Sequence, residues 1–415
     1  MRIRKHLTKN VSRREFLGAV TAVGAAAIAA GCASPAATPT TAPKPAATTA
    51  PAATTAPAAS AAGPTPKFAY KIGLIAPLTG EIKTFGESTR NAFLLAVEEA
   101  NARGAKITTS IGDDKYDAAE GVNAANKLIT QDGVKAIIGS VSSKNSIPIS
   151  EVAQTNKIVM VTPTSTSPLV TVADGKRKDY VFRACFIDPF QGTVMANFAL
   201  GTLKAKKAAV MYDNSNDYSK GLATYFKEAF VKGGGTVNVF ESYGKDDVDF
   251  AAILTKVKND NPDFLFLPDY YQKLNLINKQ ANDMGIKAAK GGGDGWDSSD
   301  LDVKAAEGGY FANHYSPEDT RPEVQNWVKT YKAKYGSVPD ALATLAYDAT
   351  NMLLAAAEKA GSDDPTKVRD ALAGLQGFKA VSGSISLDKN GDPVKAASVL
   401  QIKEGKQKFV VVVNP

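Results

Sequence analysis

The stretch from Val134 to Pro148, VKAIIGSVSSKNSIP, restricts the fold of this chain more than any other. Its apolar run, 134–138, has the length of a strand that is buried on both faces. Gly139 ends this run, the Ser and Asn residues after it are favourable helix N-caps, and Pro148 suits an early helical position. The stretch therefore predicts a strand, a polar turn and a helix, which is the repeating unit of a parallel α/β sheet.

A second unit of the same design follows directly. The expected strand 157–161 leads into the turn Thr162-Pro163-Thr164-Ser165-Thr166-Ser167-Pro168. In an open parallel sheet such turns lie at the carboxyl ends of the strands, where ligands bind. A helix N-terminus there offers free N–H groups and a positive dipole end to an anion. The two turns together fit a small anionic group such as a carboxylate, although the same residues would also serve as N-caps and nothing more.

Strands and helices alternate along the rest of the chain. The order strand, helix, strand, helix, strand occurs once from Tyr70 to Ile138 and again from Lys207 to Leu267. Further on come a strand at 309–315, two long helices at 323–335 and 340–359, and short strands that include 408–413. This alternation predicts an α/β fold with parallel sheets, and the repeat predicts two similar lobes with a cleft between them.

Residues 1–31 are interpreted as an export signal. Ser12–Leu17, SRREFL, resembles the twin-arginine (Tat) motif and precedes an apolar run that is shorter than the ~20 residues of a membrane span. Ala29-Ala30-Gly31-Cys32 resembles a lipoprotein lipobox, with Ala29 in the place of the usual Leu. Cys32 is thus expected to become a lipidated N-terminus on the outer face of the cell membrane; the alternative is an ordinary small apolar residue.

Residues 32–67 are predicted to be a disordered tether. From Ala33 on they are almost wholly Ala, Pro, Thr and Ser, without aromatic residues or hydrophobic periodicity. At ~3 Å per residue for an extended proline-rich chain, the tether would reach roughly 100 Å. A lipidated end, a long tether and a folded body together predict an anchored extracytoplasmic protein.

Charge and reactive residues exclude several classes of function. The net charge of +7 is concentrated in the leader, because removal of residues 1–31 leaves 43 basic and 41 acidic residues, so nothing favours a nucleic-acid partner. His314 is the one histidine outside the leader, and Cys185 the one cysteine beyond Cys32, which argues against a His/Cys metal cluster and a disulfide. No GxSxG elbow or P-loop is present, so an enzyme is not expected.

Six short strings, spread in order over Tyr70–Val413, resemble the branched-chain amino-acid (Leu/Ile/Val) binding family of ABC-importer substrate-binding proteins: IGLIAPLTG, IIGSVSS, VTPTSTSP, GGGDGW, PDALATLAYDA and ISLDKNGDP. The resemblance implies a type I periplasmic binding protein fold, in which two Rossmann-like lobes are joined by three crossovers, here near Ile187, His314 and Val381. Lobe 1 would comprise 68–188 plus 313–380, and lobe 2 would comprise 189–312 plus 381–415.

The resemblance also implies ligand-binding residues at matching positions. The hydroxyls of Ser143, Ser165 and Thr166 would bind an α-carboxylate. Asp294 would bind an α-ammonium, with aromatic walls at Phe85, Tyr218 and Tyr270 and with Trp296 near the acid. A zwitterion in a closed cleft loses water from both charges, so each charge needs such a partner. Two departures stand out: Asp294 replaces the Glu of a well-known branch, and Tyr116 and Ser142 replace a disulfide of some members.

Each of these residues also has a structural interpretation. Asp294 lies among four glycines and could be a turn residue. Tyr218, Tyr270 and Phe85 could be rim aromatics, and Trp296 could pack within a lobe. Cys185 is interpreted as a small buried hydrophobe and His314 as structural, since no partner is near it in the sequence.

The family resemblance implies a binding protein without a cofactor that captures an amino acid and delivers it to an ABC permease. The alternatives are a protein that binds an amide, urea or an aromatic or organic acid, and a ligand-sensing module. The replacement of Glu by Asp leaves the identity of the ligand open.

Overall fold

The computed structural model describes residues 63–415 and contains two large β-sheets. The first sheet has the strand order β2-β1-β3-β4-β7, and all its neighbouring strands are parallel. Its strands are β1 (Ala69–Ala76), β2 (Lys106–Asp113), β3 (Ala136–Ile138), β4 (Val159–Thr162) and β7 (Val181–Arg183). The sequence thus predicted the parallel pairing correctly.

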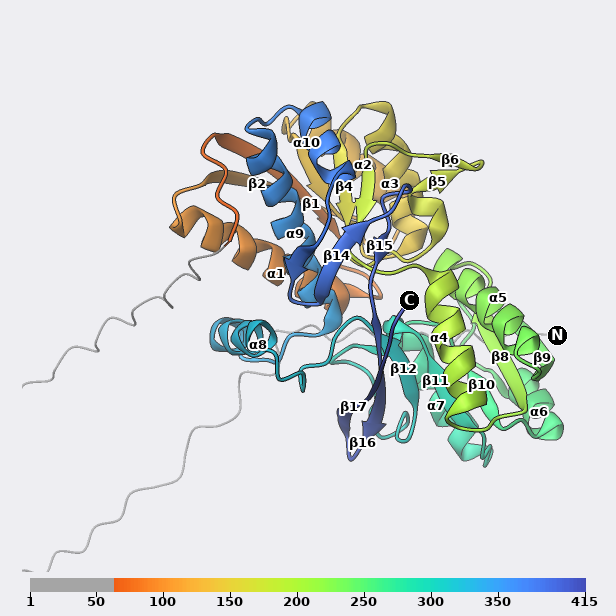
Figure 1. The fold of residues 1–415 in the computed structure, drawn as a ribbon. Helices are drawn as coiled ribbons and strands as arrows, with labels where there is room; N and C mark the ends of the chain where they lie inside the picture. The colour runs from red at the N-terminus through yellow and green to blue at the C-terminus, as the bar shows by residue number, and fades with distance from the viewer. Residues whose placement is uncertain (1–62) are drawn as a thin grey trace, which may run out of the picture. The chain divides into compact units, whose positions relative to one another are not determined.

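Helices cover both faces of the first sheet, as Figure 1 shows. Ile138 packs in one hydrophobic cluster with residues of α1 (Lys83–Ala102) and α9 (Ala341–Ala360). Its neighbour Ile137 packs in another cluster, with residues of α2 (Ala118–Thr130) and α3 (Ser143–Thr155). Successive side chains of a strand point to opposite faces, so the short apolar run in β3 is buried on both sides, as its composition predicted.

The second sheet has the order β17-β16-β12-β11-β10-β8-β9. Five strands are parallel: β8 (Lys207–Asp213), β9 (Thr236–Tyr243), β10 (Phe264–Phe266), β11 (Ala289–Gly292) and β12 (Tyr310–Asn313). The antiparallel strands β16 (Ala397–Lys403) and β17 (Lys406–Val413) extend one edge. Four helices precede or connect the strands of this sheet in the chain: α4 (Asp188–Gly201), α5 (Asp217–Lys232), α6 (Ala251–Asp260) and α7 (Tyr271–Asp283).

Local signals explain several element boundaries. Asp117 caps α2, because its carboxylate accepts the N–H groups of Ala119 and Glu120 at 2.9 and 3.0 Å. Two residues of the glycine-rich stretch, Gly291 and Gly292, belong to β11. A side chain at Gly292 would lie 2.0 Å from the Trp296 indole nitrogen, so only glycine permits this close approach.

The chain passes between the two sheets three times. The first passage is 184–187, between β7 and α4, and the second is 314–321, between β12 and α8 (Pro322–Tyr335). After α10 (Pro365–Ala373), the short strands β13 (Phe378–Ala380), β14 (Gly383–Leu387) and β15 (Pro393–Val394) precede the third.

The loop before β15 is bound to the first sheet. Arg183 of β7 donates its backbone N–H to Gly391 at 3.3 Å and its guanidinium to Asp392 at 2.6 Å. We therefore propose that the third passage lies at 395–396 and not near Val381. Residues 381–394 would then belong to lobe 1. The other proposed lobe boundaries stay as the family resemblance implies them.

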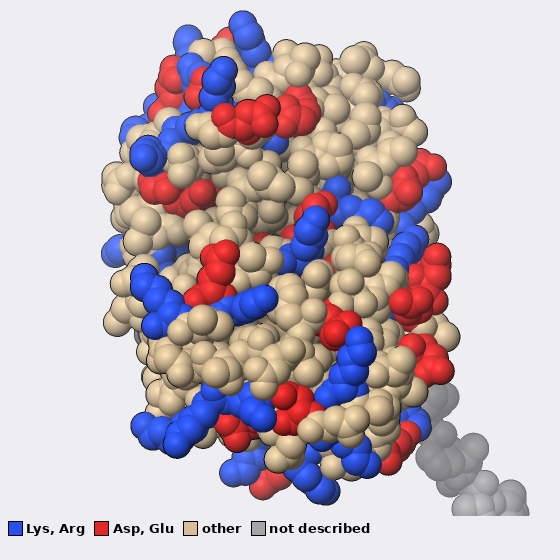
Figure 2. Space-filling view, turned by 90° about the vertical axis from the view of Figure 1, so that its right-hand side faces the viewer, with Lys and Arg blue, Asp and Glu red and all other residues tan. Residues whose placement is uncertain are grey.

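The export signal and Cys32 lie outside the described residues, as does all of the proposed tether before residue 63. Within 63–415 no helix has the length and apolar character that a membrane span requires. On the face shown in Figure 2, basic and acidic side chains lie interspersed.

Candidate ligand-binding site

A small cavity lies where the carboxyl ends of strands from both sheets meet. It is lined by Phe85, Val141, Thr164, Tyr218, Tyr270, Asp294, Gly295 and Leu342. The centre of a water molecule could occupy only about 20 Å³ of this cavity. That is room for about one water molecule, so the two sides of the cavity are in near contact.

Aromatic side chains form much of the lining. The rings of Tyr218, in the first turn of α5, and Tyr270, the N-cap of α7, are parallel within 1°, with centroids 5.1 Å apart. Phe85 of α1 meets the Tyr270 ring edge-on at 5.6 Å. The structure therefore brings together all three aromatic residues that the sequence proposed for the walls, from elements of both sheets.

Tyr116 is a fourth aromatic residue here, and the sequence did not select it. Its ring centroid lies 6.0 Å from that of Tyr270, and the Lys144 ammonium lies 5.0 Å from the Tyr116 centroid. Tyr116 follows β2 in the turn before α2, at the same end of the sheet as the serine-rich turns, and this position is the signal that could have identified it.

Asp294 begins a 3₁₀ turn, Asp294–Trp296, directly after β11. Its backbone N–H donates to Gln191 Oε1 at 2.7 Å, and the next N–H, of Gly295, donates to the Tyr218 hydroxyl at 3.1 Å. Its carboxylate oxygen Oδ2 lies 2.9 Å from His314 Nε2. No hydrogen bond from the described residues reaches the other oxygen, Oδ1, which leaves this oxygen for the cavity. We call Tyr218, Tyr270, Asp294 and Gly295 the acid wall.

In the folded protein His314 contacts Asp294, which is not its neighbour in the sequence but precedes it by 20 positions. Its imidazole ring stacks on Phe186 with centroids 3.7 Å apart and an angle of 26° between the planes. Burial lowers the pKa of His314, and the opposing attraction of Asp294 does not overcome this effect. The histidine beside the acid is therefore neutral near pH 7.

The turns 139–146 and 162–168, which we call the hydroxyl wall, adjoin each other as predicted. Their hydroxyls mostly bond within the wall. Ser165 Oγ lies 2.7 Å from Ser146 Oγ and within 3.1 Å of the carbonyl oxygens of Ser140 and Val141. Ser143 Oγ accepts the N–H of Ser167 at 3.2 Å.

Two threonines of the hydroxyl wall stand out. Thr166 Oγ1 is buried and makes no well-formed hydrogen bond among the described residues, although it lies close enough to the Asp188 carboxyl to favour its ionised form. Thr164, which the sequence did not select, lines the cavity together with Val141, while its hydroxyl donates to the Val141 carbonyl at 2.9 Å. The wall is thus placed as expected, but Ser143, Ser165 and Thr166 lie behind the cavity lining.

Arg183 supports the hydroxyl wall from inside the protein. Its guanidinium is fully buried and donates to the carbonyl oxygens of Ser165 at 2.5 Å and Ser167 at 3.0 Å. It also forms an ion pair with Asp392 at 2.6 Å. These bonds fix the backbone on both sides of Thr166. The sequence signal was a single charge at the end of a buried strand.

Asp188 joins the hydroxyl wall to the second sheet. As the first residue of α4, it donates its backbone N–H to the Thr166 carbonyl at 3.0 Å. Burial raises the pKa of Asp188 to about 8, because desolvation outweighs the Thr166 hydroxyl and the Arg183 charge, which favour the ionised form. The side chain is therefore a neutral carboxylic acid near pH 7.

Comparison with known proteins identifies the family. The periplasmic binding protein family model matches residues 69–407. This chain belongs to that family. It is a class of extracytoplasmic solute-binding proteins, not of enzymes.

Individual relatives agree with the family. Leu/Ile/Val-binding protein homolog 3 of Brucella melitensis is 34% identical over 331 residues, or 77% of this chain and 88% of that protein. A leucine-binding protein, LivK, of Thermotoga maritima has a TM-score of 0.79 at 39% identity, over 83% of this chain and 99% of that one. LivJ of Streptococcus pneumoniae, solved with isoleucine, has a TM-score of 0.78 at 30% identity, over 84% and 100%. These structures confirm the type I fold.

Trp296 of this binding protein does not line the cavity. It is fully buried, and its indole N–H donates to the Leu267 carbonyl at 2.9 Å. Gly292 and Gly309 leave the room that the indole fills. The structure therefore places Trp296 under the acid wall as a packing residue, although it is two positions from Asp294.

Cys185 is buried, as the sequence predicted for a small hydrophobe, with Sγ 3.3 Å from the Ser165 carbonyl oxygen. Burial raises the pKa of its thiol to about 12. Within residues 63–415, no three His, Cys, Asp or Glu side chains are grouped as a metal ion would require.

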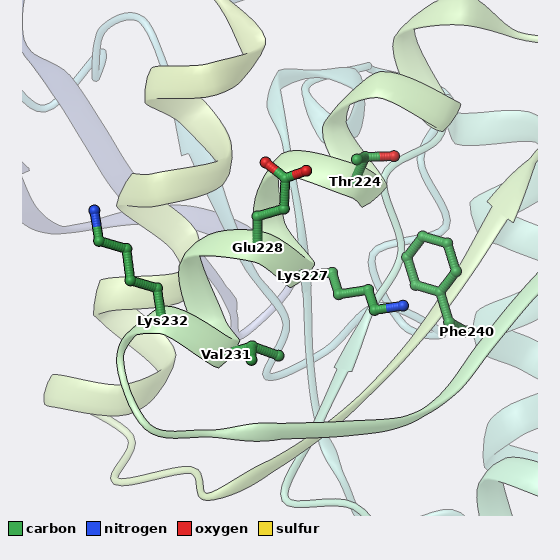
Figure 3. A pocket seen from close by; sticks show the side chains of 6 residues that line it. All are labelled: Thr224, Lys227, Glu228, Val231, Lys232 and Phe240. Atoms are coloured by element: carbon green, nitrogen blue, oxygen red, sulfur yellow. The ribbon is translucent and has the colours of Figure 1, made fainter.

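A larger hollow of about 490 Å³ lies between α5 and β9 of this binding protein, and Figure 3 shows its lining. The Lys227 ammonium lies over the Phe240 ring, 4.4 Å from its centroid, and the Glu228 and Lys232 side chains point away from that ring. The hollow shares no residue with the smaller cavity and has no buried charge in its lining. The smaller cavity is therefore the better candidate for the ligand site.

Proposed function

We propose that this chain is a lipid-anchored extracytoplasmic binding protein that captures a branched-chain or related amino acid and delivers it to an ABC permease. The observation that carries the proposal is the buried carboxylate of Asp294, whose oxygen Oδ1 is left for a cavity lined by aromatic rings. A buried anion requires a cationic partner, and an α-ammonium supplies one. The aromatic residues and Leu342 suit an apolar side chain.

The relatives support this class of ligand. Those at 30% identity or more include proteins named for leucine, isoleucine and valine, and one of them was solved with isoleucine. The same relatives support an ABC permease as the partner, since LivJ is described as a transporter substrate-binding protein.

The hydroxyl wall is the proposed site for the ligand carboxylate. Helix α3 begins at Ser143, so its first N–H groups lack partners within the helix and can bind an anion. The Ser143 hydroxyl accepts from Ser167 and keeps its own hydrogen for donation. We propose the same role for Thr166, whose hydroxyl makes no well-formed hydrogen bond among the described residues and also faces the Asp188 carboxyl. Ser165 would contribute by holding the turn.

The binding experiment compares leucine with its deaminated analogue, on the wild-type protein and on Asp294→Ala. Loss of one partner of a buried charge pair costs roughly 2–5 kcal/mol, so the variant should bind leucine about thirty-fold or more weakly. The wild type should prefer the amine, and the variant should lose most of this preference. Asp283→Ala is the matched control, because Asp283 is exposed in an ion pair with Lys279.

Other outcomes of this experiment identify the alternatives. If Asp294→Ala keeps the preference for the amine, Asp294 is only a turn residue. If the wild type binds the deaminated analogue or the amide as tightly as leucine, the ligand is an organic acid or an uncharged amide.

The lipid anchor is a separate part of the proposal. It rests on the Tat-like SRREFL motif and on the small residues before Cys32. Metabolic labelling with a fatty acid should label the wild type, and Cys32→Ala should lose the label. Equal labelling of the two proteins would reject the assignment.

A further inference from the structure

His314 begins the second passage, 314–321, and its imidazole packs against the first passage, 184–187. Its ring stacks on Phe186 of the first passage, and its side chain is 1% exposed. Its backbone N–H donates to Asn313 Oδ1 at 2.8 Å, which fixes the residue directly after β12. The ring therefore presents Nε2 to Asp294 Oδ2, at 2.9 Å, from a rigid base.

The hydrogen-bond partners determine which ring nitrogen carries the proton. A carboxylate only accepts hydrogen bonds, so Nε2 must be the donor to Asp294. Nδ1 is buried and has no partner among the described residues. A proton on Nδ1 would be a buried donor without an acceptor, which is costly. The geometry therefore favours a neutral ring with its hydrogen on Nε2.

The charged groups that face the ring agree with this assignment. Asp294 favours the protonated ring, whereas Lys395 and burial disfavour it, and the net effect lowers the pKa of His314. Cys185, on the passage that carries Phe186, has a thiol pKa raised to about 12 and stays uncharged near pH 7.

We propose that His314 is a positioning residue that makes Asp294 an acceptor for a cationic ligand group. A neutral donor holds Oδ2 in place without cancelling the charge of the carboxylate, and it leaves Oδ1 for the ligand. A protonated imidazole would neutralise the carboxylate and reduce its preference for a cation. This inference rests on the proposed function, because it requires a ligand with an ammonium group.

The first test measures how well the protein discriminates between leucine and its deaminated analogue. His314→Leu should reduce the ratio of the two affinities roughly tenfold or more, the loss expected for one hydrogen bond to a charged group. His314→Gln keeps an N–H donor and should retain more of the ratio. Phe186→Leu removes the stacking ring but not the donor, so it should lower stability and reduce the ratio less than His314→Leu does.

A purely structural His314 predicts a different result. Both ligands would then lose affinity equally in His314→Leu, His314→Gln would offer no rescue, and the proposal would be rejected. A wild type that binds neither compound would reject the proposed function and the cation-acceptor role with it.

The second test needs no ligand and no disruptive variant. The chain has two histidines, so the full-length His6→Gln variant leaves His314 as the only one. With ¹⁵N-labelled histidine, NMR at pH 7 and above should report a neutral ring protonated at Nε2, since the pKa of His314 lies below the ordinary histidine value of about 6.5. A cationic ring at pH 7, or a proton on Nδ1, would overturn the proposal even where leucine binds normally.

Discussion

The hydroxyl wall and the acid wall use their polar atoms in opposite ways. In the hydroxyl wall, the Ser165 hydroxyl bonds to Ser146 and to backbone carbonyls, and Ser143 holds the N–H of Ser167. In the acid wall, Asp294 uses one carboxylate oxygen for His314 and keeps the other for the cavity. One wall is bonded mainly to itself, and the other has acceptor capacity left for a ligand.

This difference separates stability from recognition. The hydroxyl wall rests on the buried guanidinium of Arg183, so its shape is part of the folded core. The acid wall consists of residues that begin α5 and α7 or follow β11, with aromatic rings packed against one another. Substitutions in the first wall should mainly change the free energy of unfolding, and those in the second should mainly change ligand affinity.

Arg183→Met should have the largest effect and should act on stability. It leaves Asp392 as a buried charge without its partner and removes donors from the Ser165 and Ser167 carbonyls. Breaking a buried ion pair in this way costs about 3–5 kcal/mol of unfolding free energy. Urea denaturation measures the change.

The control for Arg183→Met is Lys279→Met, which breaks an exposed pair with Asp283 and should cost no more than about 1 kcal/mol. Adding Asp392→Asn to Arg183→Met should recover part of the loss, because the unpaired charge is then gone. If Arg183→Met unfolds at the wild-type urea concentration, the hydroxyl wall does not depend on this side chain.

Asp188→Asn should change how stability depends on pH. The pKa of Asp188 is about 8 in the folded protein and near 3.8 when unfolded, so between these values the folded state binds a proton that the unfolded state does not. The contribution of this group to stability therefore falls as pH rises from about 4 to 8, by up to ~1.4 kcal/mol per pH unit. Asn cannot ionise, so the variant should lose this slope and gain stability relative to wild type at pH 8.

The urea concentration at the midpoint of unfolding, measured at pH 5, 6.5, 8 and 9, gives this slope. Asp283→Asn, at an exposed position, should follow the wild-type profile. Parallel profiles for Asp188→Asn and wild type would show that the Asp188 carboxyl is ionised in both the folded and the unfolded state. The contact between the hydroxyl wall and α4 would then tolerate a buried charge.

Much of the fold could be predicted because its signals are local. The apolar run at 134–138 predicted β3, and the alternation of strands and helices predicted parallel sheets. The same local patterns placed the two serine-rich turns at the carboxyl ends of strands, whereas Asp294 was selected through the family resemblance. Each single strand and turn among these features depends on residues that are neighbours in the sequence.

The support of the site could not be predicted, because it depends on segments that are distant in sequence. Arg183 pairs with Asp392, which follows it by 209 positions, and Gln191 accepts from Asp294 over 103 positions. His314 had no local partner for the same reason. Proximity in sequence was also misleading for Trp296, whose indole fills the space that two glycines leave and does not face the cavity.

Removing one hydroxyl from each wall gives a matched comparison. Tyr218→Phe leaves the Gly295 N–H buried without its acceptor, at a cost of about 1–3 kcal/mol. Because Gly295 lines the cavity beside Asp294, part of this cost should appear as weaker leucine binding in calorimetry. Ser165→Ala should lower the unfolding free energy by about 1 kcal/mol, with the preference for leucine over its deaminated analogue unchanged. The opposite pattern would reverse the assignment of the two walls.

Ser143→Ala should have the smallest effect, and it asks whether the hydroxyl wall also touches the ligand. The Ser143 oxygen accepts from Ser167, so its own hydrogen is free for a ligand carboxylate. We expect leucine to bind roughly tenfold more weakly, at ~1.4 kcal/mol per decade, and leucine amide to be much less affected because it lacks the charge. Ser150→Ala, in the same helix, removes a hydroxyl that bonds to the Ile147 carbonyl and should leave both affinities unchanged. If leucine binds Ser143→Ala as tightly as wild type, the Ser143 hydroxyl serves only Ser167, and the carboxylate must be held by backbone N–H groups at the start of α3.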